Sequence, residues 1–177
     1  MSIPQWFAGQ VMTADAMNAR NAKLIAQQND QTVTTSTTLV NSEITFTPEP
    51  NAIYQYWLYI SYSATVNSDL RWAWAASGAT LASFTIGYAT TAASGVNTGA
   101  DVVMRRPGNT TARVAGGTDT AGTTPPINFH SAYDLGTFIT DGTLSAVALQ
   151  FAQNTSHADQ TILRGGNQTR MIYARIG

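Results

Sequence analysis

The clearest pattern of apolar and polar positions in the chain lies in residues 53–64. Positions 54, 56, 58, 60 and 62 carry Tyr, Tyr, Leu, Ile and Tyr, while Trp57 and Tyr59 fall on the opposite face. Alternation with a period of two predicts a β-strand. Because both faces carry large side chains, we expect a second sheet to cover one face and a neighbouring subunit to cover the other.

Strand character recurs over most of the chain from residue 31 onward. Trp72 and Trp74 alternate with small or charged residues, and we expect them, like Trp57 and Tyr59, in the core or at a subunit interface. Residues 89–126 are rich in Gly, Thr, Ala and Ser and predict long loops with one or two short strands. The other segments with strand character are 31–39, 43–47, 81–88, 127–140, 144–152 and 169–176.

These segments amount to about eight to ten strands with no helix among them. We therefore expect a mainly-β fold, an antiparallel β-sandwich or jelly roll, over residues 31–177. Asp141-Gly142 lies between two segments with strand character, which is a strong hairpin signal. We expect the strands on either side of it to pair with each other.

The N-terminal residues 1–30 have a different pattern. Thr13 is a suitable N-cap, and residues 14–28 contain five alanines and neither Gly nor Pro, which predicts one short helix. Inward positions at a 3-4-3-4 spacing fit a small self-associating bundle. The residues that would line this bundle are Met17, Asn21, Leu24 and Gln28. A helix that lies against the β-domain through Met17, Leu24 and Ile25 fits the pattern equally well.

An extended lead-in, residues 1–12, precedes this helix. Trp6 and Phe7 come before any core-forming element, and Gly9 follows them. The two aromatic residues are either anchors for a partner or a cap folded onto the chain's own domain. Both interpretations fit the sequence.

The composition narrows the classes of function. Only 11% of the residues are charged, against about 25% in a typical soluble domain, and Lys23 is the single lysine. A polar but uncharged surface favours close packing against other protomers in an assembly over an ordinary neutral domain. The net charge of −1 argues against nucleic-acid binding, which needs a basic face. No apolar run is long enough to span a membrane, and the N-terminus does not resemble a signal peptide, so we expect synthesis in a cytoplasm.

Few residues in this sequence are placed where they could act in catalysis. The two histidines, His130 and His157, lie outside metal-binding spacings, and the absence of cysteine excludes disulfides and thiolate ligands. The one local cluster with a nucleophile, a base and an acid is Ser156, His157 and Asp159, in a segment typical of a loop. Two glutamates and eight aspartates are scattered along the chain, and most are placed as turn formers. We expect no enzyme activity, no metal site and no cofactor.

The stretch from Trp6 to Asn18, WFAGQVMTADAMN, resembles the lead segment W-x-x-G-x-x-x-T-A-x-x-(L/M)-N of small virion proteins. These are encoded near the tail genes of tailed bacteriophages that infect actinobacteria and related hosts. Residues 37–40, 51–54 and 142–155 are similar to a β-domain that recurs in phage minor tail, fibre and head-surface proteins. The resemblance covers most of the chain apart from residues 89–126.

This resemblance implies a homotrimer located in the virion. The lead segment, with Trp6, Phe7 and Gly9, would attach the chain to other virion proteins, and the helix would bundle around the three-fold axis. A minor tail or tail fibre protein, with a host-surface glycan as candidate partner, is the leading interpretation. A capsid decoration protein or head fibre is the alternative. A wall-degrading depolymerase and a cellular carbohydrate-binding module stay open as further hypotheses.

Overall fold

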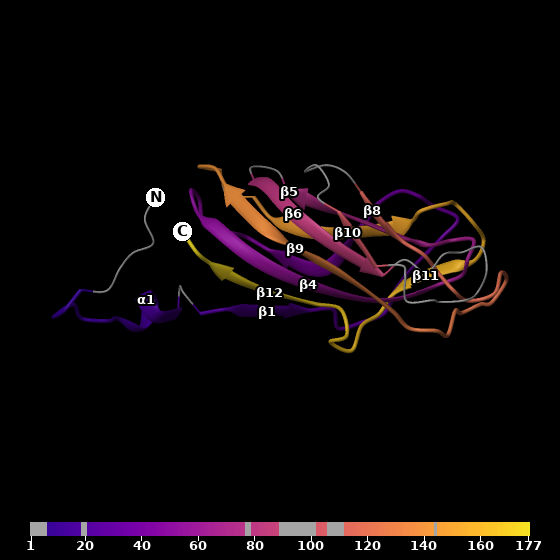
Figure 1. Cartoon of the computed structure of the whole chain (residues 1–177), viewed down its shortest axis with the longest axis horizontal. Coiled ribbons are helices and arrows are strands. Elements are labelled where there is room, and N and C mark those ends of the chain that lie inside the picture. The colour runs from indigo at the N-terminus through magenta and orange to yellow at the C-terminus, as the bar shows by residue number, and fades with distance from the viewer. Residues whose placement is uncertain (1–6, 19–20, 77–78, 89–101, 106–111, 144) are drawn as a thin grey trace.

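The computed structural model describes residues 7–18, 21–76, 79–88, 102–105, 112–143 and 145–177. Within these ranges the chain forms twelve β-strands and one short helix, α1 (Ala14–Asn18). The strands make two antiparallel sheets that pack face to face in an elongated body (Figure 1). The mainly-β sandwich predicted from the sequence is therefore confirmed.

The larger sheet has eight strands. Its main path runs in the order β1 (Lys23–Ala26), β12 (Arg170–Arg175), β4 (Ile53–Ala64), β9 (His130–Thr140), β6 (Ala79–Tyr88) and β7 (Val102–Arg105). Two further strands, β11 (Gln160–Leu163) and β2 (Gln31–Thr34), extend it, because β11 pairs with β4 and β2 pairs with β11. The smaller sheet has the order β3 (Val40–Phe46), β10 (Val147–Gln153), β5 (Leu70–Ala76) and β8 (Arg113–Ala115).

The core lies between the two sheets and is rich in aromatic rings. The alternate positions 54, 56, 58, 60 and 62 of β4 are all buried, as the period of two predicts. Tyr56 stacks on Phe138 of β9 with 4.3 Å between ring centroids, and Trp74 of β5 meets both rings edge to face. Each such aromatic pair adds about 0.5–1.5 kcal/mol beyond the burial of its surface.

The predicted hairpin at Asp141-Gly142 is wrong, because residues 141–146 connect strands of different sheets. The turn itself forms, since the Thr143 amide donates to the Asp141 carboxylate over 2.6 Å. However, β9 already pairs with β4 on one edge and with β6 on the other. No edge of β9 is left for β10, which pairs with β3 and β5 in the opposite sheet.

The helix predicted over residues 14–28 is wrong beyond Asn18, because the chain enters strand β1 at Lys23. Leu24 and Ile25 pair with Ile172 and Met171 of β12, and Ile25 also packs against the core. Pairing with the sheet thus overrides the helical propensity of the alanines, and the sheet begins before residue 31. The described part of the chain holds no helix with the length and apolar character needed to cross a lipid bilayer.

Candidate binding surfaces

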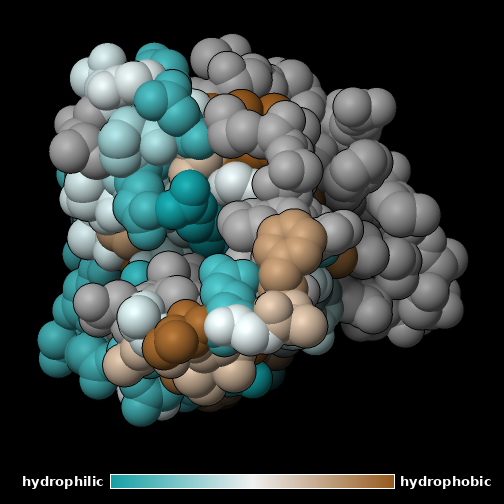
Figure 2. All heavy atoms as spheres, turned by 90° about the vertical axis from the view of Figure 1, so that its left-hand side faces the viewer, coloured by the Kyte–Doolittle hydropathy of each residue, from teal (hydrophilic) through white to brown (hydrophobic). Residues whose placement is uncertain are grey.

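Residues 7–18, here called the N-terminal arm, extend away from the sandwich, and those of them whose burial is described are exposed. In Figure 1 this segment, with α1, extends past the end of the sheets, on the side where the C-terminus lies. Phe7 is 72% exposed and Val11 is 82% exposed, and Met12 and Met17 are also exposed. Figure 2 views this end of the molecule and shows apolar residues gathered on its lower part, where the arm lies. Phe7 therefore does not cap the chain's own domain, and Trp6 lies outside the described residues.

The four residues expected to line a helix bundle do not share one helix. Met17 is in α1, whereas Asn21 lies exposed between α1 and β1. Leu24 is in β1 and is 63% exposed. Gln28 follows β1, and its side-chain amide donates to the Asn167 side chain over 2.9 Å. Within the arm, the Gln10 amide donates to the Phe7 carbonyl and the Met17 amide donates to the Thr13 carbonyl, and Gly9 takes a positive φ of 84°, which glycine adopts without strain.

The outer face of the eight-stranded sheet carries a row of apolar side chains. Leu24 pairs with Ile172, Ile172 with Trp57, and Trp57 with Leu135, so the row crosses β1, β12, β4 and β9. Leu24 is exposed and the other three are half-buried. Trp57 and Tyr59 thus lie on the outer face, whereas Trp72 and Trp74 lie in the core.

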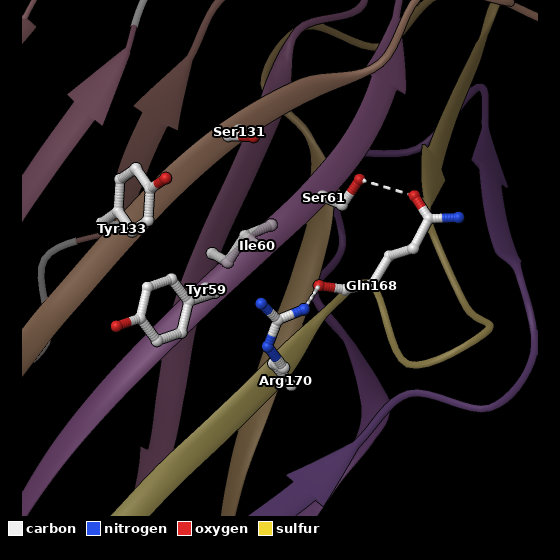
Figure 3. A pocket seen from close by; sticks show the side chains of 7 residues that line it. All are labelled: Tyr59, Ile60, Ser61, Ser131, Tyr133, Gln168 and Arg170. Atoms are coloured by element: carbon white, nitrogen blue, oxygen red, sulfur yellow. Dashed lines mark hydrogen bonds between the residues drawn. The ribbon is translucent and has the colours of Figure 1, made fainter.

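A pocket of about 260 Å³ opens on the same face, one register row farther along the strands (Figure 3). Tyr59 of β4 pairs with Tyr133 of β9 and with Arg170 of β12. The two tyrosine rings meet edge to face, with 5.3 Å between centroids and an angle of 85° between planes. The Arg170 guanidinium lies 5.4 Å from the centroid of Tyr59, a cation–π contact. We call this site the tyrosine pocket, and it is lined by Tyr59, Ile60, Ser61, Ser131, Tyr133, Gln168 and Arg170.

Polar groups around the tyrosine pocket keep spare hydrogen-bonding capacity. Arg170 donates to the backbone carbonyls of Asn167 and Gln168 over 3.3 and 3.5 Å, which are long contacts. Ser61 donates to the Gln168 side-chain carbonyl over 3.3 Å. Among the described residues, Arg170 forms no ion pair, and the Gln168 side-chain amide nitrogen donates to no acceptor. Both groups can therefore donate to a ligand.

A buried ionic cluster joins the two sheets. Asp134 of β9 is fully buried and faces Arg113 of β8, with 2.9 Å between Nε and Oδ2. Trp72 Nε1 donates to the same carboxylate over 3.0 Å, and the Tyr56 hydroxyl donates over 2.9 Å. Burial raises the pKa of Asp134, and the Arg113 charge opposes that rise. The sequence interpretation overlooked Asp134, although it stands at an inward position between Ala132 and Phe138.

The cluster of Ser156, His157 and Asp159 lies in a loop after β10. His157 Nδ1 is 3.3 Å from Asp159 Oδ2, but Asp159 is also bound by the Thr65 hydroxyl over 2.7 Å and by the Gly122 amide over 3.0 Å. These two donors, the Gly122 amide first, lower the pKa of Asp159. No hydrogen bond links Ser156 to His157 in the part of the chain that the structure describes. The contacts of Asp159 tie three loops together. Within the same residues, no group of three or more potential ligands is placed to hold a metal ion.

Comparison with known proteins identifies no family for this chain and only weak structural similarity. No protein-family model matches the chain, and no curated protein matches it. Among solved structures, the chain aligns along its whole length with 43% of a chain in the infectious bursal disease virus Gx strain, at 9% identity and a TM-score of 0.23. For the Gt strain the chain covers 43% of the matched chain, at 12% identity and a TM-score of 0.24. For the VP2 subviral particle of this virus it covers 42%, at 9% identity and a TM-score of 0.24. The chain thus spans less than half of each, and likeness this weak establishes no shared fold or function.

Proposed function

We propose that this protein is a non-enzymatic structural protein of a tailed-phage virion, anchored to the particle by its N-terminal arm. The sandwich would be displayed at the particle surface, as a homotrimeric minor tail or fibre protein. A capsid decoration protein or head fibre is the second candidate, since it would use the same arm and differ only in its place on the particle. The resemblance of residues 6–18 to phage lead segments supports both.

The exposed apolar side chains of the arm carry this proposal. Phe7, Val11, Met12 and Met17 are exposed in the isolated chain. Burial of one large apolar side chain is worth about 1.5–3 kcal/mol, so a partner that covers several of them gains substantial affinity. A segment that is apolar, exposed and tethered to a folded domain is typical of an attachment site.

The low charge of the chain supports an assembled role in the same way. A surface with few lysines and glutamates packs against neighbours with little desolvation cost, because few ions must leave water. The helix bundle no longer supports the trimer, since α1 has five residues. The homotrimer therefore stays a prediction, to be checked by the mass of the full-length chain in solution; a monomer mass would contradict it.

Removal of residues 1–18 tests the attachment. This deletion leaves β1 and its pairing with β12 intact, whereas deletion to residue 28 removes an edge strand. We expect the shorter deletion to yield a soluble sandwich with an unchanged far-UV circular dichroism spectrum. The truncated protein should not be incorporated into virions that are assembled in the absence of the full-length protein. Normal incorporation of the truncated chain would contradict the proposal. The location of the full-length chain in particle density would then separate the tail from the capsid.

Point variants make the test independent of the deletion. Val11→Asp places a charge at the most exposed apolar position of the arm, and Gln10→Glu adds the same charge at the neighbouring exposed polar position while keeping the side-chain oxygen that accepts from the Phe7 amide. We expect Val11→Asp to reduce incorporation strongly and Gln10→Glu to leave it near normal. Equal effects would mean that charge, and not the apolar contact, decides attachment.

A further inference from the structure

We propose that the tyrosine pocket binds one residue of an acidic saccharide, with the sugar ring against Tyr59 and Tyr133 and its carboxylate at Arg170. This inference does not depend on the virion proposal, because it concerns a site on the isolated domain.

The size of the pocket limits the ligand. Its volume of about 260 Å³ lies below the roughly 300–1,000 Å³ of pockets that enclose drug-sized molecules. One sugar ring fits such a volume, and the rest of an oligosaccharide would extend over the open face of the sheet. The lining residues come from β4, from β9 and from the first position of β12, with Gln168 in the turn before β12, so paired strands hold most of the site.

The tyrosine rings provide the apolar part of the site. Tyr59 and Tyr133 are both half-buried, and their edge-to-face contact fixes the angle between the rings. The C–H face of a pyranose is apolar and packs on an aromatic ring, while its hydroxyls need polar partners at the rim. Ser131, which is exposed, and the Gln168 amide nitrogen lie at the rim and can hydrogen-bond to such hydroxyls (Figure 3).

Arg170 decides the charge of the ligand. Its guanidinium is exposed, meets two carbonyls only at long distance and forms no ion pair with any described residue. No carboxylate is among the described residues that line the pocket, so the Arg170 guanidinium gives this lining a positive charge. A guanidinium binds carboxylates through two parallel hydrogen bonds, which favours a uronic or sialic acid over a neutral sugar.

Binding of a defined panel of oligosaccharides tests the inference. The probes are tetrasaccharides that contain glucuronic acid, oligosaccharides that end in sialic acid, and a neutral glucose tetrasaccharide, each titrated into the full-length chain by calorimetry and by ligand-observed NMR. We expect at least one acidic probe to bind about tenfold or more tightly than the neutral probe. Failure of every acidic probe to bind the folded chain would overturn the proposal.

Variants then assign the binding to this pocket. Arg170→Gln should remove the preference for acidic probes, Arg170→Lys should restore part of it, and Tyr133→Ala should weaken acidic and neutral probes alike. Arg175→Gln is the matched control, because Arg175 lies in the same strand but outside the pocket. Unchanged binding by Arg170→Gln, or a loss of equal size in Arg175→Gln, would overturn the site. Binding of inorganic phosphate with equal strength would reduce it to a simple anion site and would likewise overturn the saccharide assignment.

Discussion

Breaking the buried ionic cluster should destabilise the sandwich more than any change on its surface. The perturbation is Arg113→Met, which preserves much of the side-chain volume and removes the charge that faces Asp134. Asp134 is fully buried, and Arg113 is 5% exposed, so water cannot replace the lost partner. The removal of one member of such a pair costs about 3–5 kcal/mol, because the other charge stays buried without compensation.

Two further variants provide stability losses for comparison with that of Arg113→Met. Tyr56→Phe removes a single hydrogen bond to the carboxylate and should cost about 1.5–3 kcal/mol, the usual value for a bond to a charged group. The double variant Arg113→Met with Asp134→Leu removes both charges at once. We expect its loss to be smaller than the sum of the two single losses, because no unpaired charge stays buried, although Trp72 Nε1 and the Tyr56 hydroxyl lose this acceptor.

The measurement is urea unfolding followed by far-UV circular dichroism, with equal slopes required before free energies are compared. A loss below about 1 kcal/mol for Arg113→Met, or strictly additive losses in the double variant, would refute the reasoning. The pH dependence gives a second readout. Because burial raises the pKa of Asp134, the folded state holds this proton more tightly than the unfolded state, and stability falls as pH rises above the usual value of 3.8. Arg113→Met should therefore recover stability as the pH is lowered from about 7 towards about 4.

Two further predictions concern the loops. Gly117→Ala should lower the free energy of unfolding by about 1–3 kcal/mol, because its new Cβ would lie 2.3 Å from the Thr65 carbonyl oxygen. Gly142→Ala is the control, because nothing lies within 4 Å of its new Cβ, and it should melt at the temperature of the parent. Equal melting temperatures for the two variants would contradict the prediction for Gly117. The pKa of Asp159 is lowered, so its contribution to stability is present above the usual value of 3.8 and is lost as the pH falls through the lower folded value. Asp159→Asn should therefore lose less stability than the parent between about pH 5 and about pH 2, and parallel acid profiles would contradict this.

The sequence predicts those features that depend on local alternation. The inward row of β4 and the burial of Trp72 and Trp74 follow from side chains that point to alternate faces, a property of each strand by itself. Pairing partners do not follow in this way. The hairpin at Asp141 was wrong because both edges of β9 are occupied by strands distant in sequence.

The tyrosine pocket likewise could not be predicted from local alternation. Tyr59, Tyr133 and Arg170 stand on three strands that are far apart in the sequence, and only the register of those strands brings them together. Nothing in their local sequence distinguishes them from other half-buried strand residues. Asp134 is different, since a carboxylate at an inward position between apolar residues is a sequence signal of a buried ion pair that alternation alone reveals.

The short pairing of β1 with β12 has a mechanical consequence. It consists of four residue pairs, from Lys23 opposite Tyr173 to Ala26 opposite Arg170, and it links the arm to the body. The arm leaves the sheet at the end where the C-terminus lies, whereas β11 lies toward the opposite end (Figure 1). When the arm is held and a force acts on the far end, the load runs along the strands and strains all of these hydrogen bonds together, in shear. A pull on the C-terminal end of β12 instead opens the pairs one after another, starting at Tyr173. The joint is therefore stronger against traction on the far end than against peeling from the C-terminus.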